Sequence, residues 1–270
     1  MAKCLEHLVN QTYRNIEIII VDDGSKDKSV DVCKRYAEND ARIKLFSQEN
    51  SGPAVALNRG MDAASGQYVH FHDADDYVNL DYYEKMAAVA MQTDADVLCG
   101  EVNQPEYQFP KFDAIEISVA MEDKIKTTRA NDFNPAWRYL YKKDFLKEQG
   151  LRFETNTFHN WDWLLTKSAV ILAHKCATVP GAVYNVVDVP TSMGKKANLR
   201  PDKPGAADAY RRYNDLLHKH GATELMRQTY RPYHTSVFKM FNRTIARKDI
   251  WPNKTRYYLF GINIGTRYRK

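Results

Sequence analysis

The stretch Ile16-Glu17-Ile18-Ile19-Ile20-Val21-Asp22-Asp23-Gly24-Ser25 decides the fold of this 270-residue chain. Its β-branched run predicts a strand buried on both faces, because such strands are nearly continuous apolar segments. The aspartate, glycine and serine residues that follow are turn formers. We therefore predict a buried parallel strand that ends in a polar loop.

Helix and strand patterns alternate on both sides of this strand. We expect helices at residues 2–10, 28–38, 52–64 and 82–91, and strands at residues 43–46, 67–71 and 96–99. Such alternation is typical of a doubly wound α/β sheet, which binds ligands beyond the carboxyl ends of its strands. Asp22, Asp23 and the segment Asp73-Ala74-Asp75-Asp76 follow expected strands. We therefore expect them to face one crevice.

Beyond residue 100 this rhythm stops. Residues 101–190 are expected to be irregular and rich in aromatic side chains, and a helix returns near residues 207–218. No apolar run approaches the roughly 18 residues of a membrane span. The four cysteines stand apart, and the first residues lack the apolar core of a secretory signal. These features favour reduced thiols and a cytoplasmic location.

The last 44 residues, from Arg227 to Lys270, are strongly basic. They hold eleven Lys or Arg residues and one acidic residue, Asp249, for about +10. Because the whole chain carries +5, the first 226 residues sum to about −5. Basic residues interleaved with aromatic rings are typical of a segment that lies on an anionic membrane surface. Nucleic acid is the less favoured partner, and a packed helical subdomain with a charged outer face is the other alternative.

The acidic segment Asp73-Ala74-Asp75-Asp76 places three carboxylates within four residues. Oxygen ligands of this kind suit Mg²⁺ or Mn²⁺ that bridges a diphosphate. The alternative is a helix N-terminus that favours negative charge. His70-Phe71-His72-Asp73 resembles a hydrolase metal motif, but that motif would need aspartate at Ala74.

Two further loops are candidates for ligand binding. Asp22-Asp23-Gly24-Ser25 offers carboxylates to a base or ribose, although a simple turn explains the same residues. Glu49-Asn50-Ser51-Gly52-Pro53, followed by Asn58-Arg59-Gly60, forms a loop and helix N-terminus that suit phosphate. Arg59 is alternatively a solvated helix charge.

Five ordered segments resemble family 2 glycosyltransferases of the GT-A fold. They are Asn10-Gln11-Thr12-Tyr13, Ile18 to Ser25, Gln48-Glu49-Asn50-Ser51-Gly52, Asn58-Arg59-Gly60, and Gly66-Gln67-Tyr68 through Asp73-Ala74-Asp75-Asp76-Tyr77. The resemblance is close over residues 1 to about 100 and looser over 130–193. It implies an α/β fold with a doubly wound, mostly parallel sheet flanked by helices, and the chain adds a helical C-terminal extension.

The resemblance also implies roles for individual residues. Asp23 would contact the nucleobase, Asp73 the ribose or diphosphate, and Asp75 the Mg²⁺ or Mn²⁺ ion. The remaining candidates for nucleotide-sugar binding are Asp22, Ser25, Asn50, Gly52, Asn58 and Arg59.

The family's catalytic base aligns with Trp161-Asp162, where tryptophan replaces the first residue of an acidic pair. An inverting transfer needs one carboxylate near the acceptor hydroxyl, and Asp162 is the candidate. A helix N-cap is the alternative for Asp162. Trp161 and Trp163 are candidates for stacking on an acceptor sugar, and core packing explains them equally well.

One departure from the family affects the sheet. Members usually begin with an apolar strand and a loop that helps hold the base, whereas this sequence resembles them from the first helix onward. Because that strand normally lies in mid-sheet, we expect exposed edges and an open core. We assign residues 1–100 to a nucleotide-sugar-binding half, 101–200 to an acceptor-binding and catalytic half, and 201–270 to a basic, aromatic helical tail.

The resulting hypothesis is an inverting, metal-dependent transfer of a hexose from a UDP-sugar to a glycan or lipid-linked acceptor, in surface polysaccharide synthesis. The tail would make peripheral contact with the inner face of the cell membrane. A catalytically impaired binding or partner subunit is the alternative. A nucleotidyltransferase is a third hypothesis, but the Gly-rich phosphate loop that it needs near the N-terminus is not visible in the sequence.

Overall fold

The computed structural model describes residues 1–104, 109, 111–131, 135–155, 161–188, 206–220, 234–240, 243–250, 254–259 and 262–268. The described residues up to 188 belong to one compact unit, and those from 206 onward belong to a second. The predicted halves 1–100 and 101–200 thus lie mainly within one unit.

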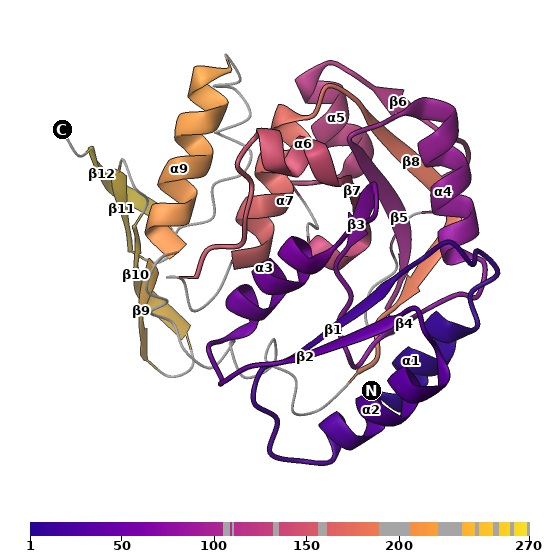
Figure 1. Cartoon of the computed structure of the whole chain (residues 1–270). Helices are drawn as coiled ribbons and strands as arrows, with labels where there is room; N and C mark the ends of the chain where they lie inside the picture. Colours follow the sequence, from indigo (N-terminus) through magenta and orange to yellow (C-terminus); the bar gives the residue numbers. More distant parts are fainter. Residues whose placement is uncertain are drawn as a thin grey trace. The chain divides into compact units, whose positions relative to one another are not determined.

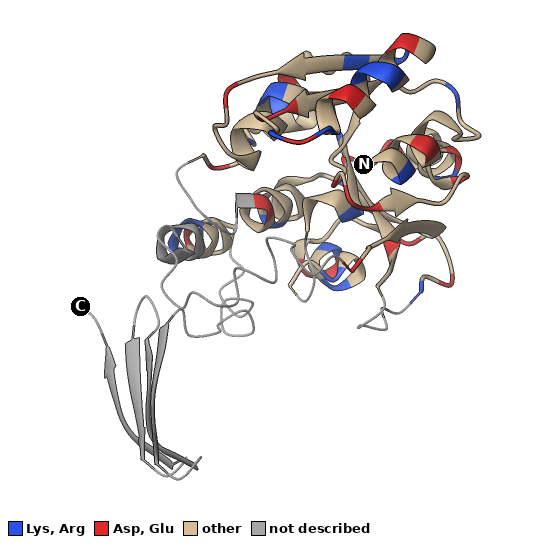
Figure 2. Ribbon diagram, turned by 90° about the horizontal axis from the view of Figure 1, so that it is seen from below, with Lys and Arg blue, Asp and Glu red and all other residues tan. Residues whose placement is uncertain are grey.

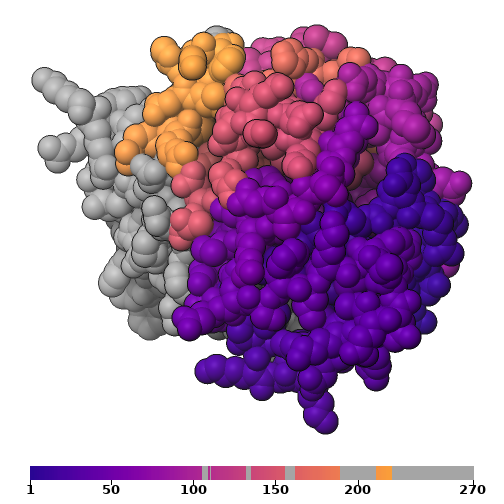
Figure 3. Space-filling view, viewed as in Figure 1, coloured from indigo at the N-terminus to yellow at the C-terminus, as the bar shows by residue number. Residues whose placement is uncertain are grey.

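Helices and strands alternate through the first unit (Figure 1). In chain order they are α1 Ala2–Val9, β1 Ile18–Asp22, α2 Ser29–Asn39, β2 Ile43–Ser47, α3 Pro53–Ala63, β3 Tyr68–His70, β4 Tyr77–Val78, α4 Tyr82–Thr93, β5 Val97–Asn103, β6 Ile117–Ser118, α5 Met121–Thr128, a 3-10 turn Ala136–Arg138, β7 Tyr139–Lys142, α6 Lys143–Glu148, α7 Trp161–Leu172 and β8 Cys176–Asn185. The predicted elements of the first hundred residues are all present, with bounds shifted by a few residues. Figure 3 shows these residues, in indigo to purple, covering much of one face of this unit.

The strands of this unit form two separate sheets. β1 and β2 make a parallel pair, in register from Ile18 opposite Ile43 to Asp22 opposite Ser47. The larger sheet has the order β3-β7-β5-β8-β4, with β6 paired to β8. Within it β5 and β8 run parallel, and the other pairs are antiparallel. The predicted α/β fold class is confirmed. The larger sheet combines parallel and antiparallel strand pairs, whereas a mostly parallel sheet was predicted.

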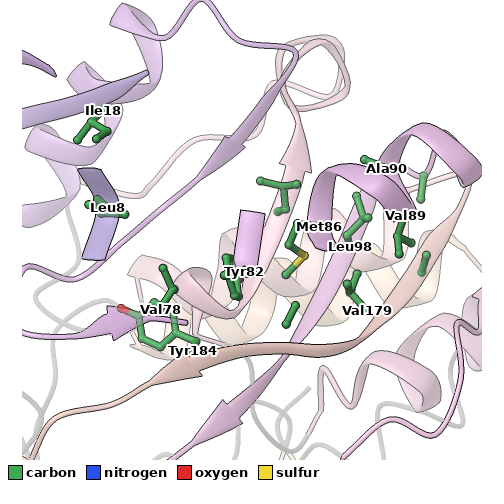
Figure 4. Packing of buried hydrophobic residues seen from close by; sticks show 14 of the residues in the cluster. Leu8, Ile18, Val78, Tyr82, Met86, Val89, Ala90, Leu98, Val179 and Tyr184 are labelled. Carbon is green, nitrogen blue, oxygen red and sulfur yellow. The ribbon is translucent and has the colours of Figure 1, made fainter. Parts of the chain in front are cut away.

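The core of this unit forms where α4 packs on β5 and β8. Tyr82, Met86 and Val89 lie on the buried face of α4, because residues three or four apart share one side of a helix. Leu98 and Val179 are 0 % and 1 % exposed beneath them. Figure 4 shows these side chains grouped together, whereas Leu8 and Ile18 lie apart, toward α1 and β1.

The prediction that residues 101–190 are irregular is wrong. β7 holds Tyr139 and Tyr141, both 0 % exposed, between β3 and β5. Aromatic side chains favour strands because they pack well on a pleated surface. The density of aromatic residues was therefore a strand signal.

Lys and Arg residues are interspersed with Asp and Glu residues on the helices of this unit (Figure 2).

The second unit corrects the prediction of a helical tail. Its helix α9, Ala206–Lys219, lies where a helix was expected. Four antiparallel strands follow, β9 His234–Met240, β10 Arg243–Ile250, β11 Lys254–Leu259 and β12 Ile262–Tyr268. β-Branched and aromatic residues favour strands, and Pro252 and Gly261 interrupt the sequence between them. Among the described residues of both units, none of the helices has the length and apolarity of a membrane span.

Glu17 ties the start of β1 to the loop before β3. Its carboxylate accepts hydrogen bonds from the backbone N–H groups of Ser65 and Gly66 at 2.5 and 2.8 Å, from the Ser65 hydroxyl at 2.9 Å, and from Lys44 Nζ at 2.8 Å. Burial alone would raise the pKa of Glu17, but these hydrogen bonds outweigh it and hold the pKa at about 2.

Glu17→Gln should therefore lower the free energy of unfolding by about 2 kcal/mol at pH 7. Because the folded-state pKa is depressed, this stabilisation is complete above the unfolded pKa near 4.5 and is lost as pH falls toward 2. Urea unfolding at pH 7 and at pH 2.5 measures the difference. The exposed Glu38→Gln is the control. A difference between Glu17→Gln and the unsubstituted chain that does not shrink at acid pH would contradict the assignment.

Candidate functional site

Asp23 joins the loops that follow β1 and β2. Its Oδ1 accepts hydrogen bonds from Gln48 Nε2 and the Ser51 backbone N–H, each at 2.8 Å, and its Oδ2 accepts the Gly52 N–H at 2.8 Å. Gly52 is the N-cap of α3. A carboxylate has about four acceptor positions, so Asp23 keeps one for a ligand while it holds the second loop in place.

Gly24 brings the same two loops into close contact. Its φ is +76°, and a Cβ atom on it would lie 2.9 Å from the Asn50 backbone nitrogen. A side chain at this position would therefore force the loops apart. The Ser25 N–H donates to Asp22 Oδ1 at 3.2 Å, so Asp22 closes the turn. Asn50 and Ser25 are exposed beside it.

Asn58 does not face the candidate site. Its Nδ2 donates to the Phe153 carbonyl at 2.9 Å, and its Oδ1 accepts the Phe153 N–H at 3.0 Å. The side chain is buried, with both polar ends engaged. The assignment of Asn58 to nucleotide-sugar binding is therefore corrected: it attaches α3 to the chain before α7.

Arg59 contacts the loop that follows β2. Its Nη1 donates to the Ser47 carbonyl at 2.9 Å and to Gln48 Oε1 at 3.2 Å. Because Gln48 in turn donates to Asp23, the guanidinium supports the loop that Asp23 holds. Arg59 is thus more than a solvated helix charge.

The carboxylates of Asp73, Asp75 and Asp76 gather after β3. One oxygen from each lies within 4.8 Å of the others. Asp73 and Asp75 are exposed, whereas Asp76 is buried and its Oδ1 accepts the Val187 N–H at 2.7 Å. The Tyr184 hydroxyl accepts the Asp73 N–H at 3.1 Å and hydrogen-bonds the Asp76 carboxylate. These partners fix the turn that presents the three carboxylates.

The charges of this cluster oppose one another. Although Asp73 is exposed as a residue, protein atoms crowd its carboxylate and reduce its hydration, which raises its pKa to about 7. The carboxylates of Asp76, Asp75 and Asp162 add to the rise. Burial likewise raises the pKa of Asp76 to about 6. Three hard oxygen donors that repel each other fit a divalent cation such as Mg²⁺ or Mn²⁺, which would relieve the repulsion.

His70 does not belong to a metal site. Its Nδ1 is 2.8 Å from the Tyr83 hydroxyl and its Nε2 is 2.7 Å from the Trp137 carbonyl. Burial lowers its pKa to about 3, which keeps the ring neutral. The structure therefore excludes His70 from the hydrolase-like motif, because both ring nitrogens are engaged.

Asp162 lies in the first turn of α7. It is among the charges that raise the pKa of Asp73, which brings it electrostatically close to the acidic cluster. Burial raises its own pKa, and the Trp163 N–H hydrogen bond opposes this rise. The Asp162 carboxylate thus accepts a hydrogen bond at the start of α7, and its charge acts on the acidic cluster.

Trp163 is poorly placed for acceptor stacking. Trp163 is 8 % exposed and lies with Lys167 Nζ 5.3 Å from its ring centroid. This burial supports core packing and corrects the stacking assignment for Trp163. Trp161 begins α7, and its side chain lies outside the described residues.

Sequence reasoning missed two supporting side chains. Gln48 links Arg59 to Asp23, and Tyr184 links Asp73 to Asp76. Gln48 stands in a motif that was recognised, two residues before Asn50, so its position was available. Tyr184 is 111 residues from Asp73, a separation that only the sheet topology closes.

Comparisons with known proteins show the family of this chain. The model of glycosyl transferase family 2 matches residues 1–159, more than half of the chain. Glycosyltransferase GlyA of Streptococcus pneumoniae is 32 % identical over 197 residues, which are 68 % of this chain and 28 % of GlyA. Glycosyltransferase EpsJ of Bacillus subtilis is 31 % identical over 201 residues, 72 % of this chain and 58 % of EpsJ. The chain thus spans less than two thirds of either relative.

A solved structure shares the fold. TarS of S. aureus, residues 1–349 in complex with UDP-GlcNAc, superposes with a TM-score of 0.73 at 20 % identity, covering 84 % of this chain and 67 % of that one. The family model and the curated relatives show the family, and the solved structure shows the fold. The chain belongs to glycosyl transferase family 2 and has its GT-A fold.

Proposed function

We propose that this chain transfers a hexose from a UDP-sugar to a glycan or lipid-linked acceptor, with inversion and with Mg²⁺ or Mn²⁺, in surface polysaccharide synthesis. Two observations together carry the proposal. Asp23 holds the loops after β1 and β2 together, and a cluster of three carboxylates follows β3. UDP-GlcNAc in TarS supports a UDP-sugar as the donor class.

Asp23, Arg59 and the 48–52 loop would hold the nucleotide. Asp23 keeps an acceptor position for an N–H of the base, and exposed Asn50 lies beside it. Gly52 caps the N-terminus of α3, and the positive end of this helix dipole would attract phosphate. Asp22 and Ser25 would shape the turn, and Asp73 would contact the ribose or diphosphate.

Asp75 would hold the metal ion, with Asp73 beside it and Asp76 positioned by Val187 behind them. When bound, the metal offsets the negative charge that builds on the leaving diphosphate. Asp162 would take the proton of the acceptor hydroxyl as its oxygen bonds to the sugar carbon and the bond from sugar to diphosphate breaks. Inversion follows because the attack is opposite to the leaving group.

UDP binding tests the proposal directly. Calorimetry with UDP should show binding that strengthens at least about tenfold when Mn²⁺ is added, because the metal bridges carboxylates and diphosphate. Release of UDP from UDP-sugars with a lipid-linked acceptor then tests transfer. No UDP binding in either condition would overturn the proposed donor site.

A second candidate function is a binding or partner subunit that has lost turnover. The observation that favours it is the separation of β1 and β2 from the larger sheet. UDP binding without sugar transfer to any acceptor, under conditions where the chain stays folded, would support this alternative. Transfer would exclude it.

The basic tail is proposed to contact the inner face of the cell membrane. Its roughly +10 charge should draw residues 227–270 to anionic lipid, at about 1 kcal/mol for each basic residue near the surface. Co-sedimentation with phosphatidylglycerol vesicles should be strong at low salt, weak at high salt, and lost in a chain that ends at Met226. Salt-sensitive binding to duplex DNA that is tighter than to vesicles would contradict the membrane assignment.

A further inference from the structure

The short strand β6 forms an edge of the larger sheet. It lies antiparallel beside β8, with Ser118 opposite Cys176, and pairs with no other described strand (Figure 1). The Thr178 N–H donates to the Glu116 carbonyl at 3.0 Å, and the Glu116 N–H donates to Thr178 Oγ1 at 2.8 Å. Glu116 and Ser118 therefore direct their backbone groups toward β8.

The residues that alternate with these two have their backbone on the outer edge. Successive residues of a strand direct their N–H and C=O groups to opposite sides, so Ile115, Ile117 and Val119 direct theirs away from β8. None of these groups forms a hydrogen bond within the part of the chain that the structure describes. The edge therefore has donors and acceptors on which a further strand can pair.

The same three residues carry exposed apolar side chains. Ile115 is 39 % exposed, Ile117 53 % and Val119 65 %. Among the described residues, the other exposed large apolar side chains are Leu80 and Met91, so the exposed apolar surface is concentrated at β6. Natural proteins normally cover or charge an apolar strand edge. The row of apolar side chains along β6 therefore indicates a surface that another strand covers.

The segment around β6 is held in place from its inner side. Ser118 is buried, and its hydroxyl donates to Thr127 Oγ1 of α5 at 3.0 Å. The Thr178 hydroxyl of β8 donates to the Ala114 carbonyl at 3.0 Å. Because the edge is already ordered, a strand that pairs with it loses less free energy to ordering.

We propose that β6 pairs with β6 of a second copy of this chain, antiparallel and about a two-fold axis, so that the larger sheets of two copies join edge to edge. Ile117 then lies opposite Ile117 of the second copy, and Ile115 lies opposite Val119. Since both copies offer the same edge, the two rows of backbone groups pair with each other. The proposal uses no residue assigned to sugar transfer, so it stands independently of the proposed function.

The charge of Glu116 favours this register. With Ile117 opposite itself, Glu116 lies opposite Ser118 of the second copy. A shift that centres the pair on Glu116 would place two carboxylates directly opposite each other, which destabilises a strand pair. The register on Ile117 therefore joins the apolar rows without opposing like charges.

The charges at the two ends of the segment favour the antiparallel direction. Lys111 and Asp113 precede β6 and balance each other, whereas Glu122 and Asp123 in the first turn of α5 make the following end acidic. Antiparallel pairing brings the acidic end of one copy toward the balanced end of the other. Parallel pairing would bring two acidic ends together. A second copy thus matches this edge in its backbone, its apolar row and its charge.

Sedimentation equilibrium on the whole chain tests the proposal, and we expect a monomer–dimer equilibrium. Ile117→Lys should raise the dissociation constant of the dimer by about 100-fold or more, because two ammonium groups replace an apolar pair on the axis. Met91→Lys on α4 is the matched control, since Met91 is 76 % exposed, and it should leave the constant unchanged. A chain that stays monomeric up to about 200 µM, or equal effects of both substitutions, would overturn the proposal.

Opposite charges at position 117 test the two-fold axis itself. Ile117→Glu alone should weaken the dimer as Ile117→Lys does. Mixed in equal amounts, the two variants should form a heterodimer at least about tenfold tighter than either variant with itself, because a lysine then faces a glutamate. Restored association also shows that both variants are folded. A mixture that associates no better than the separate variants would overturn the proposal.

Amide hydrogen exchange by NMR locates the interface. Dilution from dimer to monomer should speed exchange at Ile115, Ile117 and Val119 by about tenfold or more. The N–H of Ser118, which already faces β8, should exchange at the same rate in both states. A dimer whose dissociation leaves the three outward N–H groups unchanged would use another surface, and the proposal would fail.

Discussion

Asp75→Ala should remove the Mn²⁺ dependence of UDP binding. Asp75 offers an exposed carboxylate within 4.8 Å of the other two, whereas buried Asp76 is held by Val187. Loss of this ligand should weaken UDP binding in Mn²⁺ by about 100-fold, or about 3 kcal/mol, toward the value without metal. Calorimetry with and without Mn²⁺ measures both values.

Asp31→Ala is the control for this prediction, because Asp31 is exposed on α2 and takes no part in the cluster. It should leave UDP binding unchanged in both conditions. If Asp75→Ala binds UDP as the unsubstituted chain does in the presence of Mn²⁺, the metal assignment fails. An equal loss with and without Mn²⁺ would instead make Asp75 a nucleotide ligand.

The local periodicity of the sequence predicts much of the structure of residues 1–100. The β-branched run of β1 and the Gly-Pro start of α3 predict elements that the structure contains. Asp22 and Asp23 follow one such strand and the acidic segment another, so their positions could be predicted as well.

Contacts between residues far apart in the chain could not be predicted from the sequence. Asn58 has the appearance of a donor-site residue in its motif, yet its partner is Phe153, 95 residues away. Trp163 flanks the candidate base, but its burial depends on how α7 packs. The strands of the second unit were missed because basic and aromatic residues were interpreted by composition and not by their alternation and turn residues.

Asp162→Asn should abolish transfer while UDP binding stays nearly unchanged. A general base acts on the acceptor hydroxyl and not on the nucleotide, so turnover should fall about 100-fold or more. Asparagine is as good a helix-terminal residue as aspartate, so the substitution preserves the alternative role at the start of α7. Unchanged turnover would therefore assign Asp162 to the helix terminus alone.

The pH profile separates these two roles of Asp162 further. Burial raises the pKa of Asp162 above its usual range, and only the ionised carboxylate can accept a proton. Turnover of the unsubstituted chain should thus decline as pH falls through that raised pKa. This acid limb of the pH–turnover profile should vanish in Asp162→Asn. The metal-dependent UDP affinity of the variant, measured beside it, confirms that the donor site is intact. If the acid limb persists in the variant with full activity, the base is another carboxylate, with Glu154 and Asp132 the next to substitute; Asp132 lies outside the described residues.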